Sequence, residues 1–270
     1  MICGPQHSIE LINPELRRPN ISHVIFDFDG TLSWLRHGWP RVMLDVCLGY
    51  APSAWQSDST IQSELLAEIL SLNGKPSIHQ INRFCDRAGS DYRMPSPQTI
   101  LGEYQKALHA IVKERAASAP ADPHRFVIDG ANRALTSLRD RGVTLIILSG
   151  TIEMDVRREA ELLGLKKHFG NHIYGSTPNG RFSKKDVIDH LLQEERIEGH
   201  HLLAFGDGPV EIAFTKAVGG LAIGVASDEE ENGSHRVDSI KRAHLIAAGA
   251  DAIIPDYVDI DDLLPRIFGR

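Results

Sequence analysis

The second half of the chain alternates short apolar segments with amphipathic ones. From residue 126 on, a helical pattern at 131–142 leads into the apolar segment VTLIILSG (143–150). Further apolar segments at 172–176, 201–208, 221–227 and 251–256 are separated by helical patterns. Strands that alternate with helices are typical of a parallel sheet with right-handed crossovers. The sequence therefore predicts an α/β fold with a doubly wound parallel sheet.

An insertion interrupts this order directly after the first strand. The first strand is expected near residues 23–28, whereas residues 33–126 show no strand pattern but three helical ones, at 61–70, 78–89 and 98–118. Prolines punctuate the stretch and mark helix boundaries. We expect residues 1–33 and 126–270 to form the α/β core, and residues 34–125 to form a helical cap domain above the sheet.

The first strand ends in two aspartates. Residues 23–32 read HVIFDFDGTL, so Asp27 and Asp29 lie two positions apart, and in an extended strand their side chains would face the same side. Two carboxylates at this distance repel each other unless a cation is present or one keeps its proton. The pair therefore suggests a divalent metal or acid–base chemistry, and the simpler alternative is a strand followed by an Asp-Gly turn.

Polar residues also stand at the ends of the later strands, where doubly wound sheets bind ligands. The strand LIIL is followed by Ser149 and Gly150, the strand LLAFG by Asp207 with Glu211 a helical turn later, and one helix begins with Lys184. Carboxylates suit a hard, oxygen-seeking cation, while a hydroxyl, backbone N–H groups and a lysine suit an anion. Together they predict a site for a phosphoryl group and a magnesium ion.

Composition narrows the classes of partner. The chain has 270 residues, a net charge of −7 and three cysteines without metal-ligand spacing. The negative net charge does not indicate binding to nucleic acid or to an anionic membrane. The number and spacing of the cysteines favour free thiols in a reducing compartment. Without an apolar leader or a membrane-spanning run, we expect a cytoplasmic protein. Its oligomeric state stays open.

The four elements, in this order, resemble the motifs of the haloacid dehalogenase (HAD) superfamily of aspartate-nucleophile phosphohydrolases. The segment 27–31 (DFDGT) is similar to the first motif, Ser149 after LIIL to the second, and Lys184 to the third, with Lys185 the weaker candidate. The segment 206–211 (GDGPVE) is similar to the fourth. The helical insertion resembles the C1 cap of the branch that contains sugar-phosphate and phosphoglycolate phosphatases.

This resemblance implies a role for each residue. Asp27 would be the nucleophile that becomes an aspartyl phosphate, and Asp29 the acid and base. Asp27, Asp207 and the backbone carbonyl of Asp29 would hold Mg²⁺, with Glu211 acting through a metal-bound water. The remaining residues would bind the oxygens of the phosphate: Ser149, Gly150 and Lys184.

The function implied is that of a Mg²⁺-dependent phosphatase acting on a small phosphorylated metabolite. Three alternatives stay open: a phosphomutase, a non-enzymatic regulator on the same fold, and a receiver-like signalling domain. The segment after the first motif, with Trp34, Arg36, His37 and Trp39, would either contact the leaving group or pack the cap hinge. The acidic run 228–231 is expected to be an exposed loop, and Lys241 and Arg242 to lie at the surface.

Overall fold

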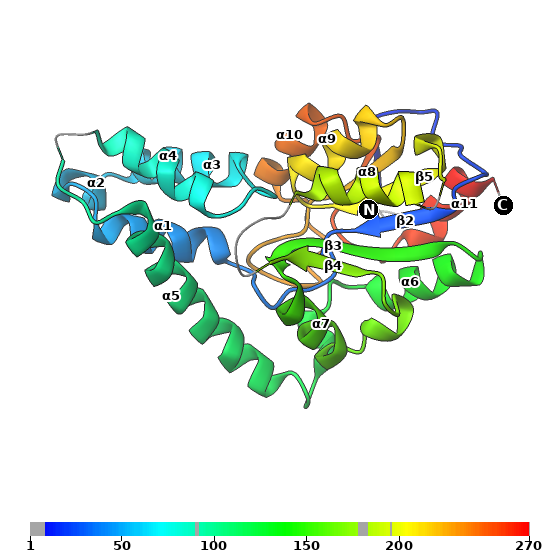
Figure 1. The fold of residues 1–270 in the computed structure, drawn as a ribbon, viewed down its shortest axis with the longest axis horizontal. Coiled ribbons are helices and arrows are strands. Elements are labelled where there is room, and N and C mark those ends of the chain that lie inside the picture. Colours follow the sequence, from blue (N-terminus) through cyan, green and yellow to red (C-terminus); the bar gives the residue numbers. More distant parts are fainter. Residues whose placement is uncertain (1–8, 90–91, 178–182, 195, 270) are drawn as a thin grey trace, which may run out of the picture.

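A computed structural model gives the structure of residues 9–89, 92–177, 183–194 and 196–269. The sequence Pro178-Asn179-Gly180, which predicts a turn, lies outside these described residues. Figure 1 shows an α/β body, and a group of helices that extends from one end of it.

The body is built on a seven-stranded sheet in the order β1-β7-β6-β5-β2-β3-β4. All neighbouring strands are parallel except the pair of β1 and β7. The predicted parallel α/β sheet is thus confirmed, with one short antiparallel strand added at its edge. The strands are β1 (Glu10–Leu11), β2 (His23–Phe26), β3 (Thr144–Ile152), β4 (Ile173–Ser176), β5 (Leu202–Gly206), β6 (Leu221–Val225) and β7 (Ala252–Ile254).

Helices cover both faces of the sheet. The alternation of side chains along β2 directs Phe26 to a core shared with α6, α7 and α11, and Ile25 to a core shared with α8. Helix α9 packs beside α8, and α10 packs beside α9, on the same face of the sheet (Figure 1). These helices are α6 (Ala131–Asp140), α7 (Glu153–Leu162), α8 (Lys184–Glu194), α9 (Pro209–Ala217), α10 (Ser239–Ala247) and α11 (Ile260–Phe268), with 3₁₀ turns η1 (Pro123–Phe126), η2 (Lys166–His168) and η3 (Gly199–His201).

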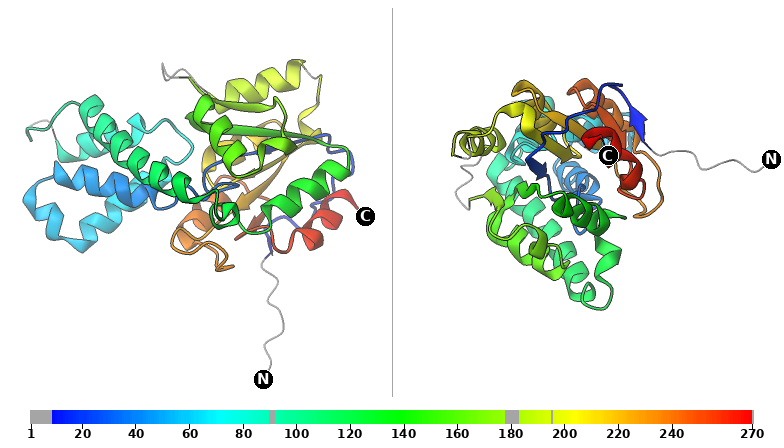
Figure 2. Two further views of the ribbon diagram at one scale, coloured as in Figure 1. Left: turned by 90° about the horizontal axis from the view of Figure 1, so that it is seen from below. Right: turned by 90° about the vertical axis from the view of Figure 1, so that its right-hand side faces the viewer.

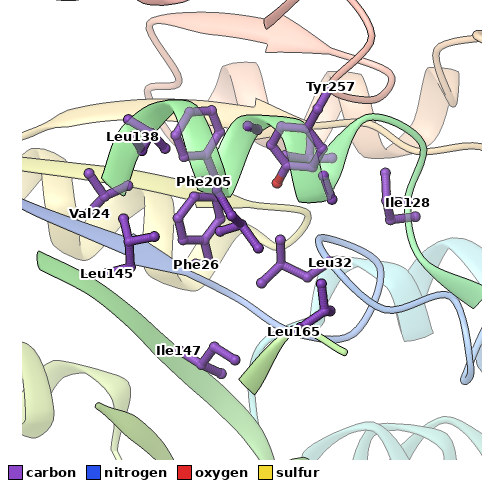
Figure 3. Close-up of a cluster of buried hydrophobic side chains, with 14 of the residues drawn as sticks. Val24, Phe26, Leu32, Ile128, Leu138, Leu145, Ile147, Leu165, Phe205 and Tyr257 are labelled. Atoms are coloured by element: carbon purple, nitrogen blue, oxygen red, sulfur yellow. The ribbon is translucent and has the colours of Figure 1, made fainter. Parts of the chain in front are cut away.

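Aromatic rings anchor the larger core directly beneath the carboxyl ends of the central strands. The rings of Phe26 and Phe205, on neighbouring strands, are stacked with centroids 5.0 Å apart, and Tyr257 packs against both (Figure 3). Close-packed rings of this kind leave little freedom to the backbone that follows. The ends of β2 and β5, which carry aspartates, are therefore rigidly placed.

The inserted helices have a hydrophobic core of their own. Apolar side chains from α1, α3, α4 and α5, among them Met43, Leu65, Phe84 and Ile100, form a cluster separate from those of the sheet. Figures 1 and 2 show these helices projecting beyond the carboxyl ends of the strands. They are α1 (Trp39–Gly49), α2 (Ser53–Ser57), α3 (Ser59–Ser71), α4 (Ile78–Ala88) and α5 (Pro97–Ser118).

The two chain segments that join these helices to the body lie side by side. The backbone N–H of Trp34 donates to the carbonyl of Phe126 at 2.8 Å, and that of Ile128 donates to Leu32 at 3.0 Å. Ser33 and Val127 form an isolated antiparallel bridge between these hydrogen bonds. The inserted helices are therefore attached through a narrow, paired connection.

Among the described residues, four strands and α-helices are not predicted by the sequence pattern: β1, α1, α2 and α11. β1 and α2 are too short to show a period, and Pro40 lies in the first turn of α1, where a proline is tolerated. In α11, Pro265 lies inside the helix, where it is normally a breaker. None of the helices among the described residues is long and apolar enough to span a membrane.

Candidate active site

Asp27 lies at the tip of the central strand β2. Its backbone N–H continues the pairing with β5 by donating to Phe205 at 3.0 Å. Its side chain is buried; Oδ1 accepts from the N–H of Phe28 at 2.7 Å and Oδ2 from Nζ of Lys184 at 2.6 Å. The carboxylate is thereby fixed in orientation beyond the end of the sheet.

Asp29 is held at both of its carboxylate oxygens. Oδ1 accepts a hydrogen bond from Nη1 of Arg36 at 3.2 Å, and Oδ2 accepts one from the hydroxyl of Thr151 at 2.7 Å. The side chain is one-fifth exposed, which makes it more open than that of Asp27. A carboxylate in this position, beside Asp27 but still accessible, suits proton exchange with a substrate.

Lys184 bridges two carboxylates at the start of α8. Its buried Nζ lies 2.6 Å from Oδ2 of Asp27 and 3.0 Å from Oε2 of Glu211. The other oxygen of Glu211, Oε1, accepts from the N–H of Gly208 at 2.8 Å and so caps α9. The alternative lysine, Lys185, is half exposed and pairs with Asp189 on its own helix.

Asp207 follows β5 and closely approaches the loop after β2. Gly30 has φ +76°, and a Cβ at that position would stand 2.7 Å from Cγ of Asp207. Only glycine fits both the left-handed backbone and this close approach. The glycine of the DFDGT segment thus lets two chain segments bring their carboxylates together.

Ser149 and Gly150 lie near the end of β3, at the same edge of the parallel sheet as Asp27 and Asp207. Ser149 is buried and its hydroxyl accepts from the N–H of Thr151 at 3.1 Å, whereas Gly150 is exposed. The structure thus brings the predicted residues to the carboxyl ends of neighbouring parallel strands. Their roles in binding phosphate stay predictions.

Three of the carboxylates fit a hard divalent cation. Asp27, Asp207 and Glu211 each offer one oxygen, and these oxygens lie within 4.8 Å of one another. An all-oxygen set of buried carboxylates suits Mg²⁺ better than a softer metal. The side-chain oxygens of Asp29 are not part of this group, so a contribution from this residue would come from its backbone carbonyl.

Electrostatics favour such a cation. Burial raises the pKa of Asp27 to about 7, although Lys184 opposes the shift. Burial also raises the pKa of Asp207 to about 6, against the effect of Lys241. For Lys184, burial alone would lower the pKa, but Asp27 and Glu211 outweigh it and raise the pKa. A cation would stabilise the ionised forms of these carboxyl groups.

Two expectations about the C-terminal third of the chain are wrong. Lys241 is buried rather than at the surface. Its Nζ lies 3.1 Å from Oδ2 of Asp207 and 2.5 Å from Oε1 of Glu229. Glu229 is itself mostly buried and accepts from the N–H of Gly38, at the start of α1, at 2.8 Å. The acidic run therefore turns one side chain inward, whereas Arg242 lies at the surface as expected.

The segment that follows the first motif is engaged within the protein. The rings of Trp34 and His37 stack with centroids 3.4 Å apart, and Trp39 packs against the core of the inserted helices. Arg36 contacts Asp29 and the buried Glu159 of α7. These contacts are those of a packed hinge, and contact of this segment with a leaving group stays a prediction.

Sequence reasoning missed several residues of the site. Glu159 and Lys241 each stand on the buried face of an amphipathic helix, beside Val156 in α7 and Leu245 in α10. A charged residue at such a position is a signal that could have found them. Asn73 carries no comparable signal, although its Nδ2 lies 3.4 Å from Oδ2 of Asp207.

Comparison with known proteins shows what this arrangement is similar to. The family model of haloacid dehalogenase-like hydrolases matches residues 21–219. A 5'-nucleotidase of Pseudomonas aeruginosa is 32% identical over 227 residues, which are 82% of this chain and 90% of that protein. The tyrosine-protein kinase PtkA of Mycobacterium tuberculosis is 33% identical over 116 residues, 42% of this chain and only 40% of that protein.

The fold has relatives among solved structures as well. A predicted phosphoglycolate phosphatase of Haemophilus somnus superposes with a TM-score of 0.60 and 15% identity, covering 91% of this chain and 98% of that one. A likeness at this identity concerns the arrangement of the backbone.

Proposed function

Because the chain belongs to the haloacid dehalogenase-like hydrolase family, we propose that it is a Mg²⁺-dependent phosphatase of a small phosphorylated metabolite. The observation that carries the proposal is the buried group of Asp27, Asp207 and Glu211 beside Lys184. It combines a fixed carboxylate nucleophile, a set of oxygen ligands for a cation and an ammonium that can neutralise phosphate.

The proposed reaction proceeds in two displacements. Asp27 attacks phosphorus and the ester bond breaks, while Asp29 gives a proton to the leaving oxygen; Asp29 then takes a proton from the water that cleaves the aspartyl phosphate. Ser149, the N–H of Gly150 and Lys184 bind the phosphate oxygens. Asp27, Asp207 and the Asp29 carbonyl would hold Mg²⁺, with Glu211 acting through a metal-bound water, and the ion would supply positive charge that offsets the repulsion between carboxylates and phosphate.

We further propose that residues 34–125 act as the cap domain that selects the substrate. Asn73 and Gly74, between α3 and α4, support this proposal: Asn73 contacts Asp207, and a Cβ on Gly74 would stand 2.9 Å from Cβ of Val210. The inserted helices thus contact the body beside the carboxylate cluster of Asp27, Asp207 and Glu211. The free thiols of Cys47 and Cys85 support the cytoplasm as the proposed location.

The test is release of inorganic phosphate by the purified protein from a panel of phosphate monoesters, with Mg²⁺ or with excess chelator. The panel contains sugar phosphates, phosphoglycolate and nucleoside 5'-monophosphates, the last because a 5'-nucleotidase is among the relatives. We expect multiple turnovers that require the metal. Isomerised ester without phosphate release would instead indicate the phosphomutase alternative, and no reaction with any ester would refute both.

A further inference from the structure

Arg36 and Glu159 form a buried ion pair that none of the four motifs includes. Arg36 lies between β2 and α1, and Glu159 lies on the buried face of α7. The guanidinium contacts both carboxylate oxygens of Glu159, with Nη2 donating to Oε1 at 2.9 Å and Nη1 donating to Oε2. The two side chains are 14% and 3% exposed, so this pair is removed from most of the solvent.

The same guanidinium holds the acid–base residue. Nη1 of Arg36 donates to Oδ1 of Asp29 at 3.2 Å, while the hydroxyl of Thr151 binds Oδ2. Arginine can only donate, so Oδ1 must remain an acceptor, whereas a hydroxyl can donate or accept. Oδ2 is therefore the oxygen of Asp29 that can carry the transferable proton.

Attachment of the chain segment does not account for the pair. The carbonyls of Leu35 and His37, on either side of Arg36, already accept hydrogen bonds from Nη1 of Arg115 at 2.8 and 2.9 Å. A buried ion pair, moreover, is often no more stabilising than apolar residues of the same volume. The guanidinium of this pair also contacts Asp29, so the pair can fix the orientation of that carboxylate.

We propose that Arg36 and Glu159 are positioning residues for proton transfer by Asp29: Glu159 fixes the guanidinium, and the guanidinium fixes Oδ1 so that Oδ2 faces the leaving oxygen. The proposal rests on the proposed phosphatase function. When the bond between Asp27 and phosphorus forms and the ester P–O bond breaks, the proton on Oδ2 passes to the leaving oxygen. In the second displacement, the water oxygen bonds to phosphorus, the bond between Asp27 and phosphorus breaks to release inorganic phosphate, and Oδ2 takes a proton from the water.

The experiment measures kcat/KM for two kinds of ester, alkyl phosphates with poor leaving groups and p-nitrophenyl phosphate with a good one. The variants are Arg36→Lys, which keeps the charge, and the double variant Arg36→Met/Glu159→Met, which removes both charges of the pair and keeps the hydrogen bond from Thr151 to Asp29. Since general acid catalysis contributes roughly 10²–10⁴-fold, the double variant should lose about tenfold or more with alkyl esters but less than about threefold with p-nitrophenyl phosphate. Arg36→Lys should recover part of this loss.

The matched control is Arg139→Ala, an exposed arginine on α6 and outside the inserted helices, which should leave both values unchanged. A second arm repeats the double variant in an Asp29→Asn background, where we expect no further loss, because the residue to be positioned is already inactive. Equal losses for both esters, or losses that multiply with that of Asp29→Asn, would overturn the proposal and indicate a substrate contact or a fold defect. A wild-type protein that hydrolyses no ester would overturn the proposed function as well, so the two failures are distinguishable.

Discussion

Replacing Asp27 by asparagine should change how the stability of the metal-free protein depends on pH. Burial raises the pKa of Asp27 from 3.8 to about 7 in the folded protein, with Lys184 opposing and Glu211 and Asp29 adding to the shift. A raised pKa means that the fold prefers the protonated form. The contribution of the protonated Asp27 carboxyl group to the free energy of unfolding is fully present below about pH 4 and is lost as the pH rises through 7.

The size of the effect follows from the same two values. A gap between 3.8 and about 7 corresponds to a loss of about 4 kcal/mol in the free energy of unfolding between pH 4 and pH 8. Asparagine is neutral throughout this range and cannot show the loss. Lys184, whose pKa is raised, stays charged over the whole range and adds no titration of its own.

Urea unfolding of wild type and Asp27→Asn, in chelator at pH 4, 6 and 8, measures this difference. The free energy of unfolding of the variant relative to wild type should rise by about 4 kcal/mol from pH 4 to pH 8. Asp140→Asn, at an exposed position on α6, is the control and should show no such trend. If the stability of Asp27→Asn relative to wild type is constant over this range, burial of the ionised Asp27 carboxylate does not lower the free energy of unfolding, and the claim is refuted.

Three further predictions concern neighbouring residues. Asp29→Asn should lower kcat/KM by roughly 10² or more with alkyl phosphates and by much less with p-nitrophenyl phosphate; equal losses in steady-state assays would argue against leaving-group protonation. Asp207→Asn should weaken Mg²⁺ binding measured by calorimetry, because it removes one of three clustered carboxylates, and an unchanged affinity would exclude Asp207 as a ligand. Gly30→Ala should cost about 1–2 kcal/mol for its left-handed backbone and also weaken Mg²⁺ binding by displacing Asp207; an unaltered melting temperature and affinity would contradict the close approach.

The order of strands and helices in the sheet could be predicted because it depends on local periodicity. The apolar runs before Asp27, Ser149 and Asp207 are the central strands β2, β3 and β5. The rule that ligands bind at the carboxyl ends of such strands then places all three residues on one edge. The family resemblance, carried by the same positions, is confirmed by the family model.

The contacts that join distant parts of the chain could not be predicted in this way. Tertiary packing pairs Lys241 with Asp207 and Glu159 with Arg36. The sequence around Lys241 and Glu159 does not indicate these partners. The acidic run at 228–231 reads as a solvated loop, since the lysine that draws Glu229 inward lies on another element. Local patterns specify which elements form, whereas pairing between elements depends on the assembled fold.

The central claim is that Asp27 becomes covalently phosphorylated during turnover. Borohydride reduces an aspartyl phosphate to homoserine, so quenching the enzyme with borohydride during hydrolysis, followed by peptide mass spectrometry, identifies the modified residue. We predict homoserine at position 27, dependent on substrate and on Mg²⁺, and none in Asp27→Asn. Phosphate release at an undiminished rate by Asp27→Asn, or homoserine at another aspartate, would contradict the account.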